Sequence, residues 1–189
     1  MTRALIWGAV IAALFTPVAL AAASPLLQYR SPVYIAAGLT GIGAMCLLLM
    51  QPLLALNVLP GLTAGQSRRL HRASGLALVT LIIAHVAGLW ITSPPDVIDA
   101  LTFTSPTPFS HWGVIAMWAA FAAAALAAAR RRLGPRLWRR AHLALAATIA
   151  AGTVAHALLI EGTMEPASKL ALTALLSAAT AITIYRTAR

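Results

Sequence analysis

The fold of this chain is decided by residues 70–91, which read LHRASGLALVTLIIAHVAGLWI. The stretch predicts a membrane-spanning helix, because about 20 apolar residues are needed to cross the roughly 30 Å hydrocarbon layer. Its ionisable side chains are His71, Arg72 and His85. The two histidines are 14 positions apart, which brings them to within about 40° of one helix face and about 21 Å apart along the axis. Both imidazoles are therefore expected on the same side of the helix.

A second apolar run repeats this pattern. Residues 138–160 contain His142 and His156, again 14 positions apart. Two helices with histidines at one spacing can hold two flat groups, one above the other, and haem with two axial imidazoles is the obvious candidate. Zinc is the main rival, but histidines about 21 Å apart on one helix cannot share one ion, and no cysteine or carboxylate cluster completes a tetrahedral set. The pattern predicts two bis-histidine haem sites.

Composition places the chain in a membrane. Hydrophobic residues make up 60% of the 189 residues and charged residues 10%, against roughly 25% charged in soluble domains. Six apolar stretches can span a bilayer: residues 4–23, 33–54, 70–91, 112–129, 138–160 and 170–185. We expect residues 1–189 to form a single all-α domain, an integral membrane six-helix bundle with two stacked b haems between its third and fifth helices.

The distribution of charge predicts the orientation. A net charge of +10 alone would suggest a nucleic-acid partner, but twelve arginines, and no acid, fall at alternate ends of the predicted helices. They are Arg3, Arg68, Arg69, Arg72, Arg130, Arg131, Arg132, Arg136, Arg139, Arg140, Arg186 and Arg189. The other ends carry Arg30, Lys169, Asp96, Asp99, Glu161 and Glu165, with a net charge of −2. By the positive-inside rule, both termini are cytoplasmic, in a bilayer that we expect to be the bacterial inner membrane. No nucleic-acid partner is expected.

The N-terminus also resembles a signal peptide, because small residues at positions 21–24 follow the first apolar run. We expect this helix to be retained, since residues 4–23 are longer than a typical signal core. Cleavage would leave the topology of the other five helices unchanged.

The connections complete the predicted topology. Residues 51–67 form a broken connection rich in proline and glycine, residues 92–110 an extended outer loop, and residues 130–140 a short basic turn. The third and fifth helices therefore run in the same direction. His71 should face His142 near the cytoplasmic surface, and His85 should face His156 near the outer surface. Small residues one turn from the histidines are expected to give a porphyrin clearance: Ser74, Gly75, Gly88, Ala146 and Gly152.

Other polar residues have candidate roles around these sites. His111 lies outside the repeated spacing, and we interpret it as a cap residue or a proton or acceptor-site group instead of an axial ligand. The acidic outer residues could attract a cationic acceptor, although topology alone explains the absence of positive charge there. Five arginines should surround the inner haem edge and pair with its propionates: Arg68, Arg69, Arg72, Arg139 and Arg140.

Taken together, these residues resemble a known family. RRLH at 68–71, LGPRLWRRAH at 133–142, His85 and His156 are similar to the ferric reductase-like transmembrane domain family. That family includes ferric reductases, the membrane half of NADPH oxidases and the haem-binding subunit of bacterial methionine sulfoxide reductase systems. The resemblance implies two b haems on the four matched histidines and electron transfer across the membrane. A similar spacing occurs in the longer cytochrome b of respiratory complex III, so it indicates stacked haems more strongly than it indicates this family.

One difference from the family bears on the electron donor. Ferric reductases and NADPH oxidases continue into a flavin and nicotinamide domain, whereas this sequence stops at Arg189 and has no Gly-rich dinucleotide fingerprint. We therefore expect no flavin in this chain. The donor is expected to be a separate flavoprotein or a quinol, and the acceptor an extracytoplasmic protein or metal ion. In the sulfoxide reductase subunits the first histidine of the third helix can be absent, so His71 favours a two-haem conduit.

The sequence leaves three functions open. The first is a transmembrane cytochrome b, an oxidoreductase component whose own catalytic activity is undecided. The second is a quinol-fed haem subunit of a periplasmic reductase, such as a methionine sulfoxide reductase system. The third is a transporter or assembly factor without redox chemistry, which predicts a colourless purified protein.

Overall fold

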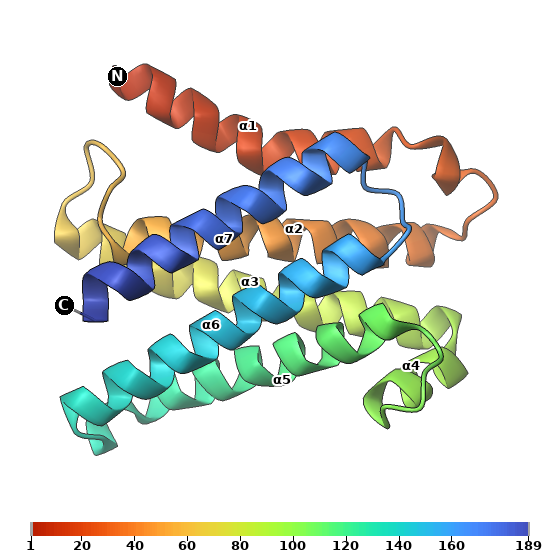
Figure 1. The fold of residues 1–189 in the computed structure, drawn as a ribbon. Helices are drawn as coiled ribbons and strands as arrows, with labels where there is room; N and C mark the ends of the chain where they lie inside the picture. Colours follow the sequence, from red (N-terminus) through yellow and green to blue (C-terminus); the bar gives the residue numbers. More distant parts are fainter. Residues whose placement is uncertain (1, 189) are drawn as a thin grey trace.

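The structure, a computed structural model, describes residues 2–188. Met1 and Arg189, which belong to the predicted domain and its charge pattern, lie outside the described residues. Within residues 2–188 every regular element is helical, with no strand, and six helices are long and apolar enough to cross a membrane. These findings confirm the prediction of an all-α integral membrane protein. The six helices are α1 (Arg3–Ala22), α2 (Pro32–Ala55), α3 (Ala64–Thr92), α5 (Pro108–Ala128), α6 (Pro135–Leu159) and α7 (Pro166–Ala188) (Figure 1).

Several helices begin before the apolar runs that predicted them. Thr63 and Gln66 form a capping box, so α3 starts six residues before the predicted span at residue 70. At the start of α7, the Glu165 carboxylate accepts hydrogen bonds from the backbone N–H groups of Ala167 (2.9 Å) and Ser168 (2.7 Å). Capping groups are polar, so hydropathy alone places these starts too late.

Two predicted connections differ from the structure. The outer loop at residues 92–110 is not extended, because it contains α4 (Pro94–Leu101). Proline is well tolerated in a first helical turn, and Ser93 Oγ donates a hydrogen bond to Asp96 Oδ2 over 2.6 Å. The predicted connection at residues 51–67 is also too long, since α2 continues through Pro52 to Ala55.

The helices are arranged around two antiparallel pairs. α2 packs closely against α3, and α5 against α6, whereas α3 and α6 contact each other little. α7 covers parts of α6 and α2, and it also contacts α1 (Figure 1). The histidine-bearing helices α3 and α6 are thus each packed against a partner helix. Their backbones do not pack closely against each other.

The two ends of the bundle differ in charge. The α2–α3 connection and the turn between α5 and α6, which contains a short 3-10 helix η2 (Ala129–Arg132), lie at one end with the first turn of α1 and the last turn of α7 (Figure 1). This end, called the arginine-rich end below, carries every described arginine except Arg30. The opposite, acidic end carries Arg30, Lys169, Asp96, Asp99, Glu161 and Glu165.

Candidate functional site

His85 and His156, the two histidines nearer the acidic end, are called the outer histidines below, and His71 and His142 the inner histidines. Backbone carbonyls of the partner helices fix the two outer rings. His85 Nδ1 donates to the carbonyl of Ala37 in α2 over 2.7 Å, and His156 Nδ1 donates to the carbonyl of Phe109 in α5 over 2.8 Å. A carbonyl only accepts, so Nδ1 carries the hydrogen in both rings and Nε2 keeps its lone pair. Neither Nε2 atom makes a hydrogen bond with any residue that the structure describes.

Each outer ring lies against a glycine of the neighbouring helix. A Cβ atom on Gly41 would lie 2.8 Å from His85 Nδ1, and one on Gly113 would lie 2.7 Å from His156 Nδ1. Both distances are shorter than real Cβ contacts, so only glycine admits these rings. Neither glycine is among the site residues that the sequence predicts.

An internal repeat could have identified these glycines. Each lies one helical turn after the residue whose carbonyl accepts the hydrogen bond from the histidine, Gly41 after Ala37 and Gly113 after Phe109. The two glycines are 72 positions apart, and His85 and His156 are 71 apart. The α2–α3 pair and the α5–α6 pair therefore hold their outer histidines by the same local arrangement.

The predicted porphyrin clearance is wrong for the two glycines nearest the outer histidines. A Cβ on Gly88 would lie 2.7 Å from Ala37 Cβ, and one on Gly152 would lie 3.0 Å from the carbonyl oxygen of Trp112. These glycines face α2 and α5, where they allow close helix packing, so they are not free to accommodate a bound group.

The inner histidines meet across the bundle. The ring centres of His71 in α3 and His142 in α6 are 6.3 Å apart, with 65° between the ring planes. His71 Nδ1 lies 3.2 Å from the carbonyl oxygen of Gln51, which it can reach as a donor. The side-chain amide of Gln51 donates a hydrogen bond to Ser74 Oγ over 2.9 Å.

His142 differs from the other three ligand candidates. Its Nδ1 is buried and has no hydrogen-bond partner among the described residues. The ring stacks on Trp138, one turn earlier in α6, with 5.2 Å between ring centres and 11° between planes. Trp138 Nε1 is likewise buried without a partner. Ring stacking, not a carbonyl, therefore orients His142.

The five predicted arginines are exposed at the arginine-rich end. Their guanidinium groups form no ion pair or hydrogen bond with another residue of the described chain. Three lie in the first turns of α3 and two in the first turns of α6: Arg68, Arg69, Arg72, Arg139 and Arg140. In α3, two of these arginines precede His71 by two and three positions, and Arg72 follows it directly. In α6, both arginines precede His142, again by two and three positions.

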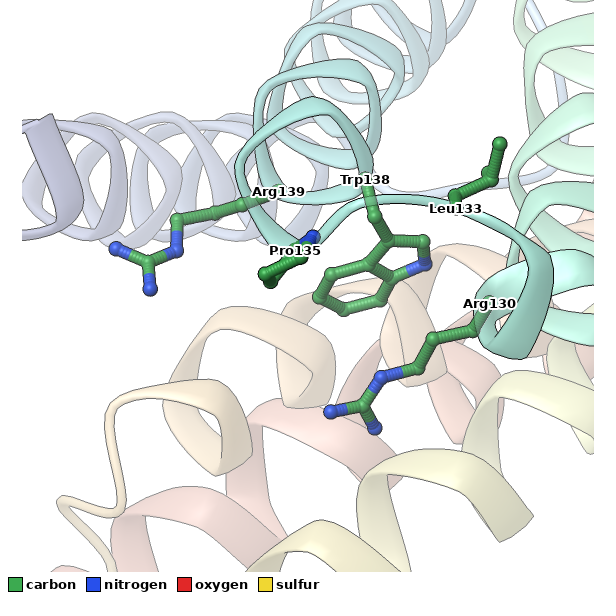
Figure 2. Close-up of a pocket in the computed structure, with 5 residues that line it drawn as sticks. All are labelled: Arg130, Leu133, Pro135, Trp138 and Arg139. Carbon is green, nitrogen blue, oxygen red and sulfur yellow. The ribbon is translucent and has the colours of Figure 1, made fainter.

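A pocket adjoins the inner pair at this end. It has a volume of about 160 Å³ and is lined by Arg130, Leu133, Pro135, Trp138 and Arg139. The guanidinium carbon of Arg130 lies 4.8 Å from the Trp138 ring centre. The sequence does not predict Arg130 as a site residue. Figure 2 shows this guanidinium next to the indole ring, with Arg139 extending past Pro135.

His111 makes a local contact at the acidic end. Its Nε2 lies 3.2 Å from the carbonyl oxygen of Phe103, and its ring stacks on the Phe103 ring with 5.7 Å between centres. The contact joins the start of α5 to the segment that follows α4.

The spacing of the inner histidines and the hydrogen bonds of the outer histidines fit axial ligation of haem. A metal between two imidazoles, with bonds of about 2 Å to each nitrogen and about 1.1 Å from nitrogen to ring centre, separates the ring centres by about 6 Å. The inner pair shows 6.3 Å. Metal-bound histidines usually donate their other ring N–H to a carbonyl or carboxylate, as the outer pair does. Among the described residues, no group of three or more His, Cys, Asp or Glu side chains is placed to hold a bare metal ion.

Comparison with known proteins identifies the family. No curated protein and no solved structure matches the chain. The model of the family described as "Ferric reductase like transmembrane component" matches residues 40–153, more than half of the chain. This region includes His71, His85 and His142, and ends just before His156. Domains of this family generally bind haem, and the family suggests a transmembrane electron-transfer component. The chain belongs to the ferric reductase-like transmembrane family.

Proposed function

We propose that this protein carries electrons across the membrane through two b haems, one ligated by His71 and His142 and the other by His85 and His156. The observation that carries the proposal is the state of the outer histidines. Each donates Nδ1–H to a carbonyl and leaves Nε2 without a partner among the described residues, which is the arrangement that a metal-bound imidazole needs. The 6.3 Å between the inner ring centres supports a second site of the same kind.

The ligand set favours electron transfer over oxygen chemistry. A haem held by two imidazoles has no free coordination position and exchanges single electrons by an outer-sphere route. The protein's own residues supply the placement. The carbonyls of Ala37 and Phe109 orient the outer rings, and Gly41 and Gly113 admit them. The arginines near His71 and His142 are suited to pair with carboxylates at the inner site.

The charge asymmetry supports a direction of flow. By the positive-inside rule, the arginine-rich end and both termini face the cytoplasm, and we place the protein in the bacterial inner membrane. Electrons then enter near His71 and His142 from a flavoprotein or a quinol. They leave past His85 and His156 to an extracytoplasmic protein or metal ion.

Haem content and single-histidine variants test the proposal. The purified protein should show a Soret band that shifts on dithionite reduction, and pyridine haemochrome quantitation should give two haems b per chain. His71→Ala and His142→Ala should remove one spectral component, and His85→Ala and His156→Ala the other. A colourless protein would instead support a transporter or assembly factor. A shared phenotype of His71→Ala and His156→Ala would contradict the pairing.

A further inference from the structure

We propose that the pocket lined by Arg130, Leu133, Pro135, Trp138 and Arg139 binds the phosphate headgroup of an anionic phospholipid from the leaflet at the arginine-rich end. The pocket shares Arg139 with the arginines proposed to pair with carboxylates at the inner haem site, whereas Arg130, Leu133, Pro135 and Trp138 lie outside that set. The inference does not require haem to be bound. Four observations about the pocket carry it.

The first observation is that the polar groups of the pocket are all donors. Its polar side chains are the guanidinium groups of Arg130 and Arg139 and the indole of Trp138, and its other walls are apolar. Guanidinium and indole N–H groups donate and cannot accept. The pocket therefore suits an acceptor-rich anion.

The second observation is that these donors have no acceptor. The guanidinium groups of Arg130 and Arg139 form no ion pair or hydrogen bond with any residue that the structure describes, whereas the backbone carbonyl of Arg130 accepts a hydrogen bond from the N–H of Leu133. The contact that the structure gives the Arg130 guanidinium is with the face of the Trp138 ring. A phosphate oxygen is the strong, charged acceptor that these two guanidinium groups lack within the described chain.

The third observation is the size of the pocket. Its volume of about 160 Å³ is well above the roughly 10–15 Å³ that one water molecule needs on the same measure. A phosphate group has five heavy atoms, so it fits this space, whereas a folded peptide segment does not.

The fourth observation is the depth of the pocket in the bundle. It lies at the turn between the membrane-spanning helices α5 and α6, where the chain leaves the apolar layer. Tryptophan favours the membrane interface, and Leu137, beside Trp138 in the chain, is 62% exposed. Basic pockets between helices at the cytoplasmic side are typical binding sites for acidic lipid headgroups. An acyl chain would thus continue along an apolar surface while the phosphate meets the arginines.

Native mass spectrometry of the purified full-length protein tests this inference. The probes are phosphatidylglycerol and phosphatidylcholine with identical acyl chains, and inorganic phosphate as a competitor. We expect one phosphatidylglycerol to be retained per chain, with phosphatidylcholine retained far less. Inorganic phosphate should not displace the lipid, because it lacks the acyl chains.

Paired arginine variants separate the pocket from general charge. Arg130→Gln/Arg139→Gln should weaken phosphatidylglycerol binding by about 30-fold. Arg131→Gln/Arg132→Gln removes the same charge from the same turn but outside the pocket, and should leave binding within about threefold of the wild type.

Four outcomes would overturn the inference. Equal losses in the two double variants would show that binding follows net charge. Equal retention of the two lipids, or displacement by inorganic phosphate, would show that no anionic lipid headgroup is selected. Unchanged lipid binding with loss of Soret absorbance in Arg130→Gln/Arg139→Gln would assign these arginines to haem carboxylates. Because haem content is read separately from lipid mass, failure of the haem proposal would remain distinguishable.

Discussion

A single backbone carbonyl determines which nitrogen of each outer histidine is free. Ala37 and Phe109 accept from Nδ1 of His85 and His156, so Nε2 is the nitrogen of each ring that keeps its lone pair. Such an acceptor also raises the basicity of the opposite nitrogen. His142 lacks this acceptor and stacks on Trp138 instead. The four histidines are therefore alike in spacing and unlike in support.

The glycines beside the outer rings give a prediction at this scale. Gly41→Ala or Gly113→Ala would place a Cβ within 2.8 Å of His85 Nδ1 or 2.7 Å of His156 Nδ1. The ring cannot turn away without breaking its hydrogen bond, so we expect haem affinity at the outer site to fall by about 10–100-fold. Haem content per chain, measured as the pyridine haemochrome, should fall toward one.

Gly38→Ala is the matched control for that prediction. Gly38 lies in the same helix, and a Cβ there would meet nothing within 4 Å. If Gly38→Ala lost as much haem as Gly41→Ala, the effect would come from α2 itself and not from the fit of the His85 ring.

At the scale of the helix, polar caps define where the membrane-spanning elements begin. The Glu165 carboxylate at the start of α7 accepts two backbone hydrogen bonds, from Ala167 and Ser168, and these bonds lower its pKa below the ordinary value of 4.5. The ionised form is thus favoured in the folded protein. Glu165 therefore stabilises the start of α7 above the unfolded pKa, and this contribution is lost as the pH falls through the lowered folded pKa.

Glu165→Gln should reveal this cap by its pH dependence. At pH 7 we expect the variant to melt at a lower temperature than the wild type, because the amide is a weaker acceptor than the carboxylate. Melting is measured by circular dichroism at 222 nm. The difference should shrink as the pH falls below 4.5. Glu161→Gln is the control, since Glu161 lies at the same end and makes no hydrogen bond with any described residue. A difference independent of pH would contradict the cap.

The same scale shows what sequence could and could not reveal. Six spans follow from hydropathy, and the membership of the ferric reductase-like family follows from motifs around His71 and His142. Helix α4 escaped prediction because Pro94 and Pro95 mark a loop as readily as a first helical turn. Gly41 and Gly113 escaped because their importance depends on which helix lies beside each histidine, a fact of tertiary packing.

At the scale of the whole molecule, the bundle separates charge between its two ends. The arginine-rich end carries all described arginines but Arg30, and the acidic end carries all four carboxylates. The inner histidine pair lies nearer the first and the outer pair nearer the second, because His71 and His142 lie toward the starts of α3 and α6. Topology alone produces such an asymmetry, so a role in docking needs a separate test.

Replacing Arg131, Arg132 and Arg136 with glutamine supplies that test. If an acidic flavoprotein docks at this end, the triple variant should be reduced more slowly by that donor, and the defect should diminish as salt is added. Surface fields are screened over about 8 Å at physiological ionic strength. Reduction by dithionite should be unchanged, and a quinol donor should be nearly indifferent. The variant spares Arg130 and Arg139, so the proposed lipid pocket remains intact.

Oriented vesicles determine the direction of flow. With the arginine-rich end inside, the physiological donor should reduce haem only from the inner compartment, and an impermeant acceptor should oxidise it only from outside. This sidedness is expected because each histidine pair lies nearer one face of the membrane. Histidines 14 positions apart in one helix are separated by about 21 Å along its axis. Reduction of haem by the donor solely from the outer face would contradict this direction. A quinol site beside His85 and His156 would then explain electron entry, and the arginines would be left with topology and lipid binding.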